Sequence, residues 1–242
     1  MDLSIVIPTF NESQKIRKDI IAAADFLKNA KLAGEIIVVD DGGQDQTDQA
    51  ARSVTVPQGV ELHILRHQTN HGKGYAVKTG MKLARGKYVM FADSGCCTDY
   101  RFALKGLELL SKDVCDLAYG SRKLAQSVIK RKQHWSRRLA SKAFRQFILA
   151  FMQIPGRFTD TQCGFKLYKG DIGRRLYDEC TTDGFTFDVE IILKALKKGY
   201  RIAEFPIEWQ SDRDTRVKFF QMSGRLFPEL LRIKKEIAKI PL

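Results

Sequence analysis

The sequence predicts an α/β fold with a mostly parallel sheet, and three observations support this. Apolar, β-branched runs occupy residues 3–8, 35–39 and 88–92, and stretches of helical length separate them. Each run leads directly into acidic residues. The composition, 242 residues with 44% hydrophobic and 29% charged, is typical of a folded domain with one large core.

The predicted elements alternate between strand and helix along the chain. In order they are strand 3–8, helix 13–30, strand 35–40, helix 46–53, strand 60–65, helix 73–84, strand 88–92, helix 100–110, strand 116–119, the long basic helix 133–153, helix 185–198 and strand 201–205. This alternation through residue 122 implies a doubly wound sheet flanked by helices.

We expect one domain over residues 1–218 and an amphipathic helical appendage over 219–242, because no Gly/Ser-rich linker interrupts the chain. Pro228 suits the first turn of that helix. An apolar stripe follows it, flanked by lysines and an arginine: Leu230, Ile233, Ile237 and Ile240. This pattern fits a helix lying on a membrane surface, and it also fits ordinary packing against the body.

Acidic residues should meet at one edge of the sheet. Glu12 follows the first strand, Asp40 and Asp41 end the second, and Asp93 follows the strand at 88–92. Ligands of open α/β sheets bind beyond the carboxyl ends of the strands. The sequence therefore predicts a crevice for a metal–phosphate ligand or a sugar nucleotide.

The net charge of +13 is concentrated, because residues 117–159 contain ten lysines and arginines and no acid. Such a surface suits an anionic partner: nucleic acid, lipid headgroups or a phosphorylated substrate. A solvated basic helix face is the alternative. No nucleic-acid motif accompanies the charge, and the aromatic residues of this stretch repeat at helical spacing, so we expect no nucleic-acid partner.

Several classes of protein lack support. No G-x-G-x-x-G or Walker A motif is present, and no apolar run is long enough to span a membrane. The amino terminus shows no basic region or cleavage site of a secretion signal. Five cysteines without a C-x-x-C motif indicate reduced thiols in a cytoplasm, with a zinc site as the alternative.

An ordered set of motifs resembles the family 2 glycosyltransferases, in the branch of the dolichyl- and polyprenyl-phosphate hexose synthases. They are Pro8-Thr9-Phe10-Asn11-Glu12, Asp40-Asp41-Gly42, Asn70-His-Gly-Lys-Gly-Tyr-Ala-Val77, Asp93-Ser94-Gly95, Gly120-Ser121-Arg122, Asp160-Thr-Gln-Cys-Gly-Phe-Lys166 and Phe187-Asp188-Val-Glu190. The resemblance covers residues 3 to about 220. It implies a GT-A fold, related to the Rossmann fold, and an inverting enzyme that uses a nucleotide sugar.

The resemblance also implies the residues that bind the donor: Pro8, Thr9, Glu12, Asp40, Asp41, Lys73 and Asp93. Carboxylates accept hydrogen bonds from ribose hydroxyls and base N–H groups. For Asp40 and Asp41 a helix N-cap is the alternative role. Lys73 would help to hold the diphosphate at a helix start, or it would simply be solvent-exposed.

Asp93 stands where the family carries a metal-binding D-x-D motif, and this sequence departs from that motif at Gly95. We expect Mg²⁺ or Mn²⁺, held by Asp93 together with the donor phosphates. Asp99 would assist or would cap the following helix. Cys96 and Cys97 are expected to pack rather than to bind metal.

The resemblance implies that the acceptor phosphate is bound by five residues: Arg122, Arg137, Ser141, Lys166 and Arg216. For each cation, plain surface exposure is the alternative. The catalytic residues would be Asp93, Arg122 and Asp160, with Asp160 orienting a substrate or anchoring its own loop. An acceptor phosphate is ionised near neutral pH, so positioning and electrostatics would control the reaction without a strong base.

These observations predict a transferase that moves a hexose from a nucleotide sugar to a polyprenyl phosphate. It would be a cytoplasmic protein bound peripherally to the anionic inner face of a membrane. The alternatives are a relative that glycosylates a soluble or polysaccharide acceptor, and a non-catalytic relative that only binds nucleotide sugars.

Overall fold

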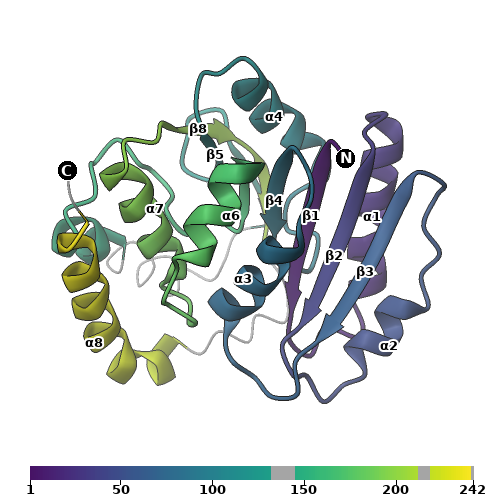
Figure 1. The fold of residues 1–242 in the computed structure, drawn as a ribbon, viewed down its shortest axis with the longest axis horizontal. Helices are drawn as coiled ribbons and strands as arrows, with labels where there is room; N and C mark the ends of the chain where they lie inside the picture. Colours follow the sequence, from purple (N-terminus) through teal and green to yellow (C-terminus); the bar gives the residue numbers. More distant parts are fainter. Residues whose placement is uncertain (132–144, 212–218, 241–242) are drawn as a thin grey trace.

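The computed structural model describes residues 1–131, 145–211 and 219–240. Its central sheet has seven strands in the order β3-β2-β1-β4-β7-β5-β8 (Figure 1). They are β1 Leu3–Thr9, β2 Gly34–Asp40, β3 Val60–Arg66, β4 Tyr88–Ala92, β5 Leu117–Ser121, β7 Phe165–Lys169 and β8 Ile202–Pro206. All pairs are parallel except those of β7, which runs antiparallel to β4 and β5. The predicted α/β fold with a mostly parallel sheet is confirmed.

Helices connect and cover these strands. They are α1 Ile16–Asn29, α2 Thr47–Arg52, α3 Lys73–Leu83, the 3₁₀ turn η1 Tyr100–Phe102 with α4 Ala103–Ser111, α6 Gly170–Asp178, α7 Phe187–Lys197 and α8 Phe219–Ala238. A small second sheet pairs β6 Val128–Arg131 with β9 Glu208–Gln210 in parallel. The expected helix 133–153 is described only from residue 145, where it is helical to residue 151.

The sheet is buried on both faces, because alternate residues of its strands point to opposite sides. In β2, Ile36 and Val38 join a core with α1 and α4, whereas Ile37 and Val39 join a core with α3, α6 and α7. Continuous apolar runs are typical of such doubly covered strands.

The carboxy-terminal helix packs against the body. Leu230 and Ile233 of α8 have no exposed area and belong to the core on the α7 side of the sheet. Pro228, expected in the first turn, lies inside α8, because the helix begins nine residues earlier at Phe219. The domain boundary between residues 218 and 219 stays a prediction.

The strand order places a topological switch point beside β1. The chain passes from β1 to β2 and β3 on one side and then adds β4 on the other side of β1. Ligands of doubly wound folds bind at this switch point, beyond the carboxyl ends of the strands. Because β7 is antiparallel and Ala92 pairs with Phe165, the segment before β7 meets the segment after β4 at the same edge.

Candidate active site

Asp93 follows β4 and lies where three segments of the chain meet. Its backbone N–H donates to the carbonyl of Gly164, with N and O 2.8 Å apart. A β-carbon on Gly164 would stand 2.0 Å from Cγ of Asp93. On the other side, Nζ of Lys73 lies 2.5 Å from Oδ1 of Asp93. The structure therefore places the predicted donor residues Lys73 and Asp93 in one ion pair.

Lys73 carries its positive charge into the crevice. Burial lowers the pKa of its ammonium, but the carboxylates of Asp93 and then Asp188 outweigh burial, so the pKa is raised. Lys73 is also the first residue of α3, and the backbone N–H groups of the first helical turn point out of that same amino-terminal end. A protonated amine at a helix start is suited to hold an anionic group such as a diphosphate.

Asp41 organises the loop that leads to Lys73. One carboxylate oxygen accepts from Nδ1 of His67 at 2.8 Å and from the backbone N–H of His71 at 3.1 Å. The other accepts from Nδ2 of Asn70 at 2.9 Å and from the backbone N–H of Gly72 at 2.7 Å. A carboxylate has about four acceptor sites, so these donors use its capacity. Asp41 therefore shapes the donor side of the crevice through the loop.

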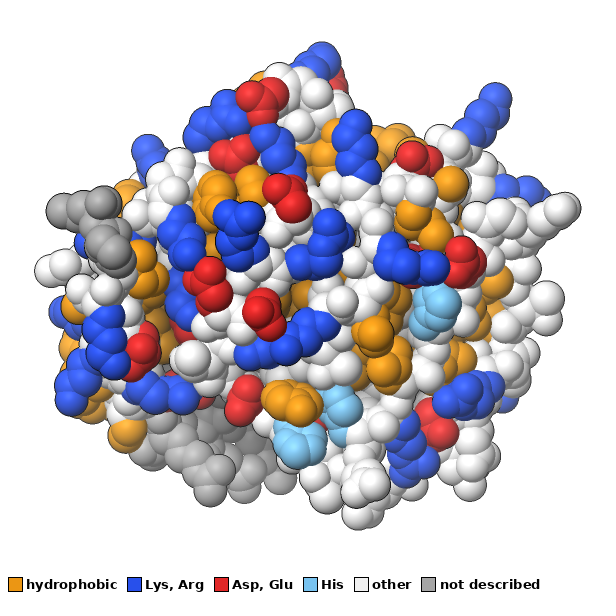
Figure 2. All heavy atoms as spheres, in the orientation of Figure 1, with side chains coloured by type: hydrophobic (Ala, Val, Ile, Leu, Met, Phe, Trp, Pro, Cys, Tyr) orange, Lys and Arg blue, Asp and Glu red, His pale blue; other side chains and the backbone are white. Residues whose placement is uncertain are grey.

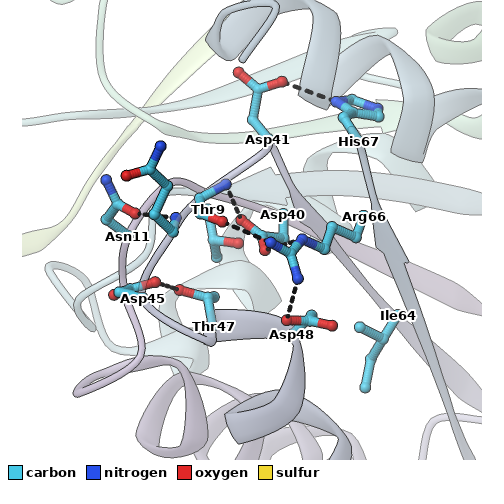
Figure 3. A network of polar contacts seen from close by, with 12 residues as sticks. Thr9, Asn11, Asp40, Asp41, Asp45, Thr47, Asp48, Ile64, Arg66 and His67 are labelled. Carbon is cyan, nitrogen blue, oxygen red and sulfur yellow. Dashed lines mark hydrogen bonds and ion pairs between the residues drawn. The ribbon is translucent and has the colours of Figure 1, made fainter. Parts of the chain in front are cut away.

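Asp40 is differently placed, and Figure 3 shows it between Thr9 and Arg66. Its side chain has no exposed area; Oδ1 accepts from the backbone N–H of Gly43 at 3.1 Å. Oδ2 has no hydrogen-bond partner among the described residues, and Nε of Arg66 lies 3.7 Å from it. Burial raises the pKa of Asp40, against the opposing effects of Gly43 and Arg66. Neither aspartate acts as the helix N-cap considered above, since α2 has Gln46 at that position.

The loop after β1 is locked to the loop after β2. The side chain of Asn11, which has a φ of 56°, accepts from the backbone N–H of Gln44 at 2.7 Å. The backbone N–H of Glu12 donates to Oγ1 of Thr47 at 2.8 Å. Oε2 of Glu12 lies 3.4 Å from Nζ of Lys15. Pro8 and Thr9 are buried strand residues. These contacts bring the residues expected at the base and ribose to one rim of the crevice.

Arg122 and Asp160 form a two-pronged ion pair at the end of β5. Nε of Arg122 lies 2.6 Å from Oδ2 of Asp160, and Nη2 lies 2.7 Å from Oδ1. Burial raises the pKa of Asp160, but Arg122 lowers it by more, so the pKa lies below its usual range. Glu204 accepts from the backbone N–H of Asp160 at 2.9 Å, and the guanidinium lies over the ring of Trp209. Asp160 therefore both anchors its loop and orients Arg122.

Lys166 does not fit the role expected of it. Its side chain is fully buried, and Nζ donates to Asp188 at 2.5 Å and to the carbonyl of Thr161 at 2.9 Å. The rings of Tyr119 and Phe91 enclose the ammonium. Because the ammonium of Lys166 is paired with Asp188 in the interior, Lys166 supports the loop before β7 and does not present a charge to an acceptor.

Other expectations are outside the structure or are modified by it. Arg137, Ser141 and Arg216 lie outside the described residues. Asp99 caps η1, where it accepts from the backbone N–H of Arg101 at 2.9 Å, so the capping alternative holds. No disulfide joins the five cysteines, all of which the structure describes. Within the described chain, the only cluster with metal-ligand spacing is Glu35, Glu61 and His63, and Arg85 pairs with both of these glutamates.

In the described loop after β4, Asp93 is the carboxylate that could hold a divalent cation. The side chain of Asp93 is 37% exposed, whereas position 95 is a glycine and Asp99 faces Arg101. A single carboxylate suits Mg²⁺ or Mn²⁺ when phosphate oxygens and water supply the other ligands. Three supporting residues had no assigned role in the sequence analysis: Asp19, Gly164 and Glu204. Gly164 lies inside a quoted motif, but nothing near Asp19 in the sequence marks it.

A mostly parallel sheet with a switch point beside β1, and an acid after β4 that is paired with a lysine, are features of the GT-A class of glycosyltransferases. A family model described as Glycosyl transferase family 2 matches residues 4–174, and the chain belongs to this family. Among solved structures, glucosyl-3-phosphoglycerate synthase from Mycobacterium tuberculosis, in complex with Mn²⁺ and UDP, has the same fold. Its TM-score is 0.70, at 16% identity, over 100% of this chain and 81% of that one.

Curated relatives share more of the sequence. Dolichyl-phosphate β-glucosyltransferase of Dictyostelium discoideum is 29% identical, over 96% of this chain and 73% of the relative. The enzyme of that name from Saccharomyces cerevisiae is 33% identical, over 86% of this chain and 66% of the relative. The chain covers 34% of glycosyltransferase AglD of Haloferax volcanii, at 28% identity. In the described part of this chain, no helix has the length and apolar character needed to cross a bilayer.

Proposed function

We propose that this protein transfers a hexose from a nucleotide sugar to a polyprenyl phosphate, with inversion at the anomeric carbon. The observation that carries the proposal is the ion pair between Lys73 and Asp93 at the carboxyl end of β4; a second cation, Arg122, follows β5. The names of the curated relatives support glucose as the sugar and dolichyl phosphate as the acceptor class. The UDP-glucose bound by a structural neighbour supports a uridine donor.

On the donor side, Lys73 and a divalent cation on Asp93 would share the charge of the diphosphate. Mn²⁺ in the structural neighbours supports such a cation. When bound, the cation supplies Lewis-acid stabilisation of the departing nucleoside diphosphate. Asp40, which has no exposed area, would support the nucleoside side of the site through the backbone N–H of Gly43. Asp41 would act through the loop that it holds.

On the acceptor side, Arg122 would bind the phosphate of the lipid, since its planar guanidinium matches phosphate oxygens. An oxygen of that phosphate attacks the anomeric carbon, the new C–O bond forms, and the bond to the diphosphate breaks. A phosphate monoester is largely dianionic at neutral pH, so no general base is required. Asp160 would hold Arg122 in the orientation needed for in-line attack.

A membrane surface would present the acceptor, and α8 has the features to meet it. The exposed rings of Phe147 and Phe227 both contact Phe151, with ring centroids 5.4 Å apart for Phe147–Phe151 and 5.3 Å apart for Phe151–Phe227, and Leu231 of α8 is also exposed. Lysines accompany these apolar groups, and Figure 2 shows cations and apolar side chains side by side over α8. We therefore propose peripheral attachment to anionic lipid at the cytoplasmic face.

The direct test incubates the protein with radiolabelled UDP-glucose, polyprenyl phosphate and detergent, with and without EDTA. We expect label in the organic extract and its loss when EDTA removes the cation. Asp93→Asn should abolish transfer, whereas Asp99→Asn, which changes an exposed capping carboxylate six residues on, should retain it. Label found only in a water-soluble product would support a soluble acceptor, and equal activity of Asp93→Asn would refute the site.

A further inference from the structure

Asp19 of α1 is a buried carboxylate directed at the loop that carries Asp93. It has no exposed area, although aspartate is almost never fully buried unless it is paired. Its oxygens accept from the backbone N–H of Gly95 at 2.9 Å and from that of Cys96 at 2.7 Å. The thiol of Cys96 donates to the same carboxylate at 3.0 Å. The donors thus come from residues two and three positions after Asp93.

The conformation of this loop explains why it needs a carboxylate. Gly95 has a φ of 93° and Cys96 a φ of 46°. A non-glycine residue in the left-handed region brings its β-carbon too close to the following carbonyl oxygen, so this conformation is unfavourable. Successive backbone N–H groups in such a turn point into one concavity, which binds an anion. The carboxylate of Asp19 occupies that concavity and so stabilises a turn that the local sequence disfavours.

A second anchor holds the other side of the loop. In β9, the backbone N–H of Gln210 donates to the carbonyl of Cys97 at 2.9 Å, and its side chain donates to the carbonyl of Cys96 at 3.2 Å. The neighbouring Trp209 contacts Arg122 through its ring. The loop is therefore fixed between α1 and the strand that supports the cation of the acceptor side.

We infer that Asp19 is a positioning residue, which holds the 94–97 turn so that Asp93 faces the diphosphate and its cation. This inference rests on the proposed function. The family's second metal-binding acid is missing at Gly95, and the backbone of Gly95 is turned toward Asp19. Asp93 is then the one carboxylate of this loop available to a cation, and its placement depends on the turn.

The test compares Asp19→Asn with Glu35→Gln. Glu35 is equally buried and also accepts from a side-chain hydroxyl and a backbone N–H, those of Ser4 and Arg85, but it lies at the opposite end of the sheet. We expect Asp19→Asn to weaken binding of UDP with Mn²⁺, measured by calorimetry, at least tenfold and to lower transfer about 100-fold. Glu35→Gln should lose thermal stability and keep the wild-type affinity. Gln210→Leu, a milder change at the second anchor, should weaken binding in the same direction.

The rate at which iodoacetamide alkylates Cys96, measured by mass spectrometry, shows whether the 94–97 turn is still held in place. We expect faster alkylation in Asp19→Asn, because the negative charge that holds the thiol in its protonated form beside the turn is lost. Wild-type affinity for UDP with Mn²⁺ in Asp19→Asn and Gln210→Leu, at either alkylation rate, would overturn the positioning role. If the wild-type protein binds no UDP with Mn²⁺, the proposed function fails, and the alkylation rates still show whether Asp19 holds the turn.

Discussion

Gly164 and Asp93 are in such close contact that a β-carbon at position 164 would displace the carboxylate of Asp93. A β-carbon there would lie 2.1 Å from each carboxylate oxygen of Asp93 and 2.0 Å from its Cγ. The backbone of Gly164 also accepts the N–H of Asp93. The segment before β7 therefore packs directly against the carboxylate of Asp93.

Replacement of Gly164 by alanine should displace that carboxylate and spare the fold. We expect kcat/KM for transfer to fall about 100-fold, since a shift of about 1 Å at a reacting centre has effects of that size. Steady-state kinetics with the labelled donor measures it. Gly156→Ala is the matched control, because a β-carbon there meets nothing within 4 Å. Equal activity of the two variants would show that the contact has no part in transfer.

Removal of the Lys73 charge should weaken binding of the nucleoside diphosphate. Lys73→Met leaves Asp93 without its cation and takes one charge from the diphosphate site. A hydrogen bond to a charged group contributes about 1.5–3 kcal/mol, which corresponds to a rise of roughly 10- to 150-fold in the Kd for UDP. Lys82→Met changes an exposed lysine of the same helix and should bind UDP normally in calorimetry. An unchanged Kd in Lys73→Met would remove Lys73 from the donor site.

The Arg122–Asp160 pair should contribute pH-dependent stability. The folded-state pKa of Asp160 lies below its unfolded value of about 3.9, so the stabilisation is present above that pH and is lost as the pH falls through the folded-state pKa. Asp160→Asn should lower the free energy of unfolding by about 3 kcal/mol at pH 7. The loss should become smaller at pH 3.

Urea unfolding of wild type and Asp160→Asn at both pH values measures this difference. Asp171→Asn, on the exposed side of α6, serves as the control for loss of a carboxylate. A loss of equal size at pH 7 and pH 3 would argue against an ion pair as its source.

Charge reversal on α8 should release the protein from anionic lipid. Lys234→Glu with Lys235→Glu places an acid at the ring of Phe151, which contacts the exposed ring of Phe227. Each basic residue near an anionic surface contributes about 1 kcal/mol, so we expect at least a tenfold loss of binding. Sedimentation with vesicles of phosphatidylcholine and phosphatidylglycerol measures it. Lys105→Glu together with Lys112→Glu, on and just after α4, is the control pair, and equal loss in both pairs would mean that α8 is not the contact surface.

The alternation of apolar runs and helical stretches was enough to predict the first half of the fold. Strands β1, β2 and β4 are continuous apolar runs that are almost wholly buried, so their pattern is unambiguous, whereas β3 is an edge strand whose residues are mostly half-buried. β7 could not be recognised in the same way. It has five residues with lysines at 166 and 169, and it is a strand because Lys166 finds Asp188 inside the core.

The motifs likewise located the candidate site but did not predict the role of each residue in it. Asp41 was expected to bind the donor directly, and tertiary contacts with residues 67–72 occupy its carboxylate. Lys166 was expected at the acceptor, and the fold buries it. A residue type and its place in a motif show which groups are present, whereas their hydrogen bonds depend on segments distant in the chain.

The α/β class and the edge of the sheet at which acids gather could be predicted from the sequence alone. These features follow from local periodicity and from the positions where strands end, and both can be recognised from residues that are consecutive in the sequence. Three contacts depend on the tertiary fold: Asp19 supports the turn after Asp93, Gly164 packs against the carboxylate of Asp93, and Asp160 orients Arg122. The partners in these contacts are 38 to 77 residues apart, and packing of the sheet alone brings them together.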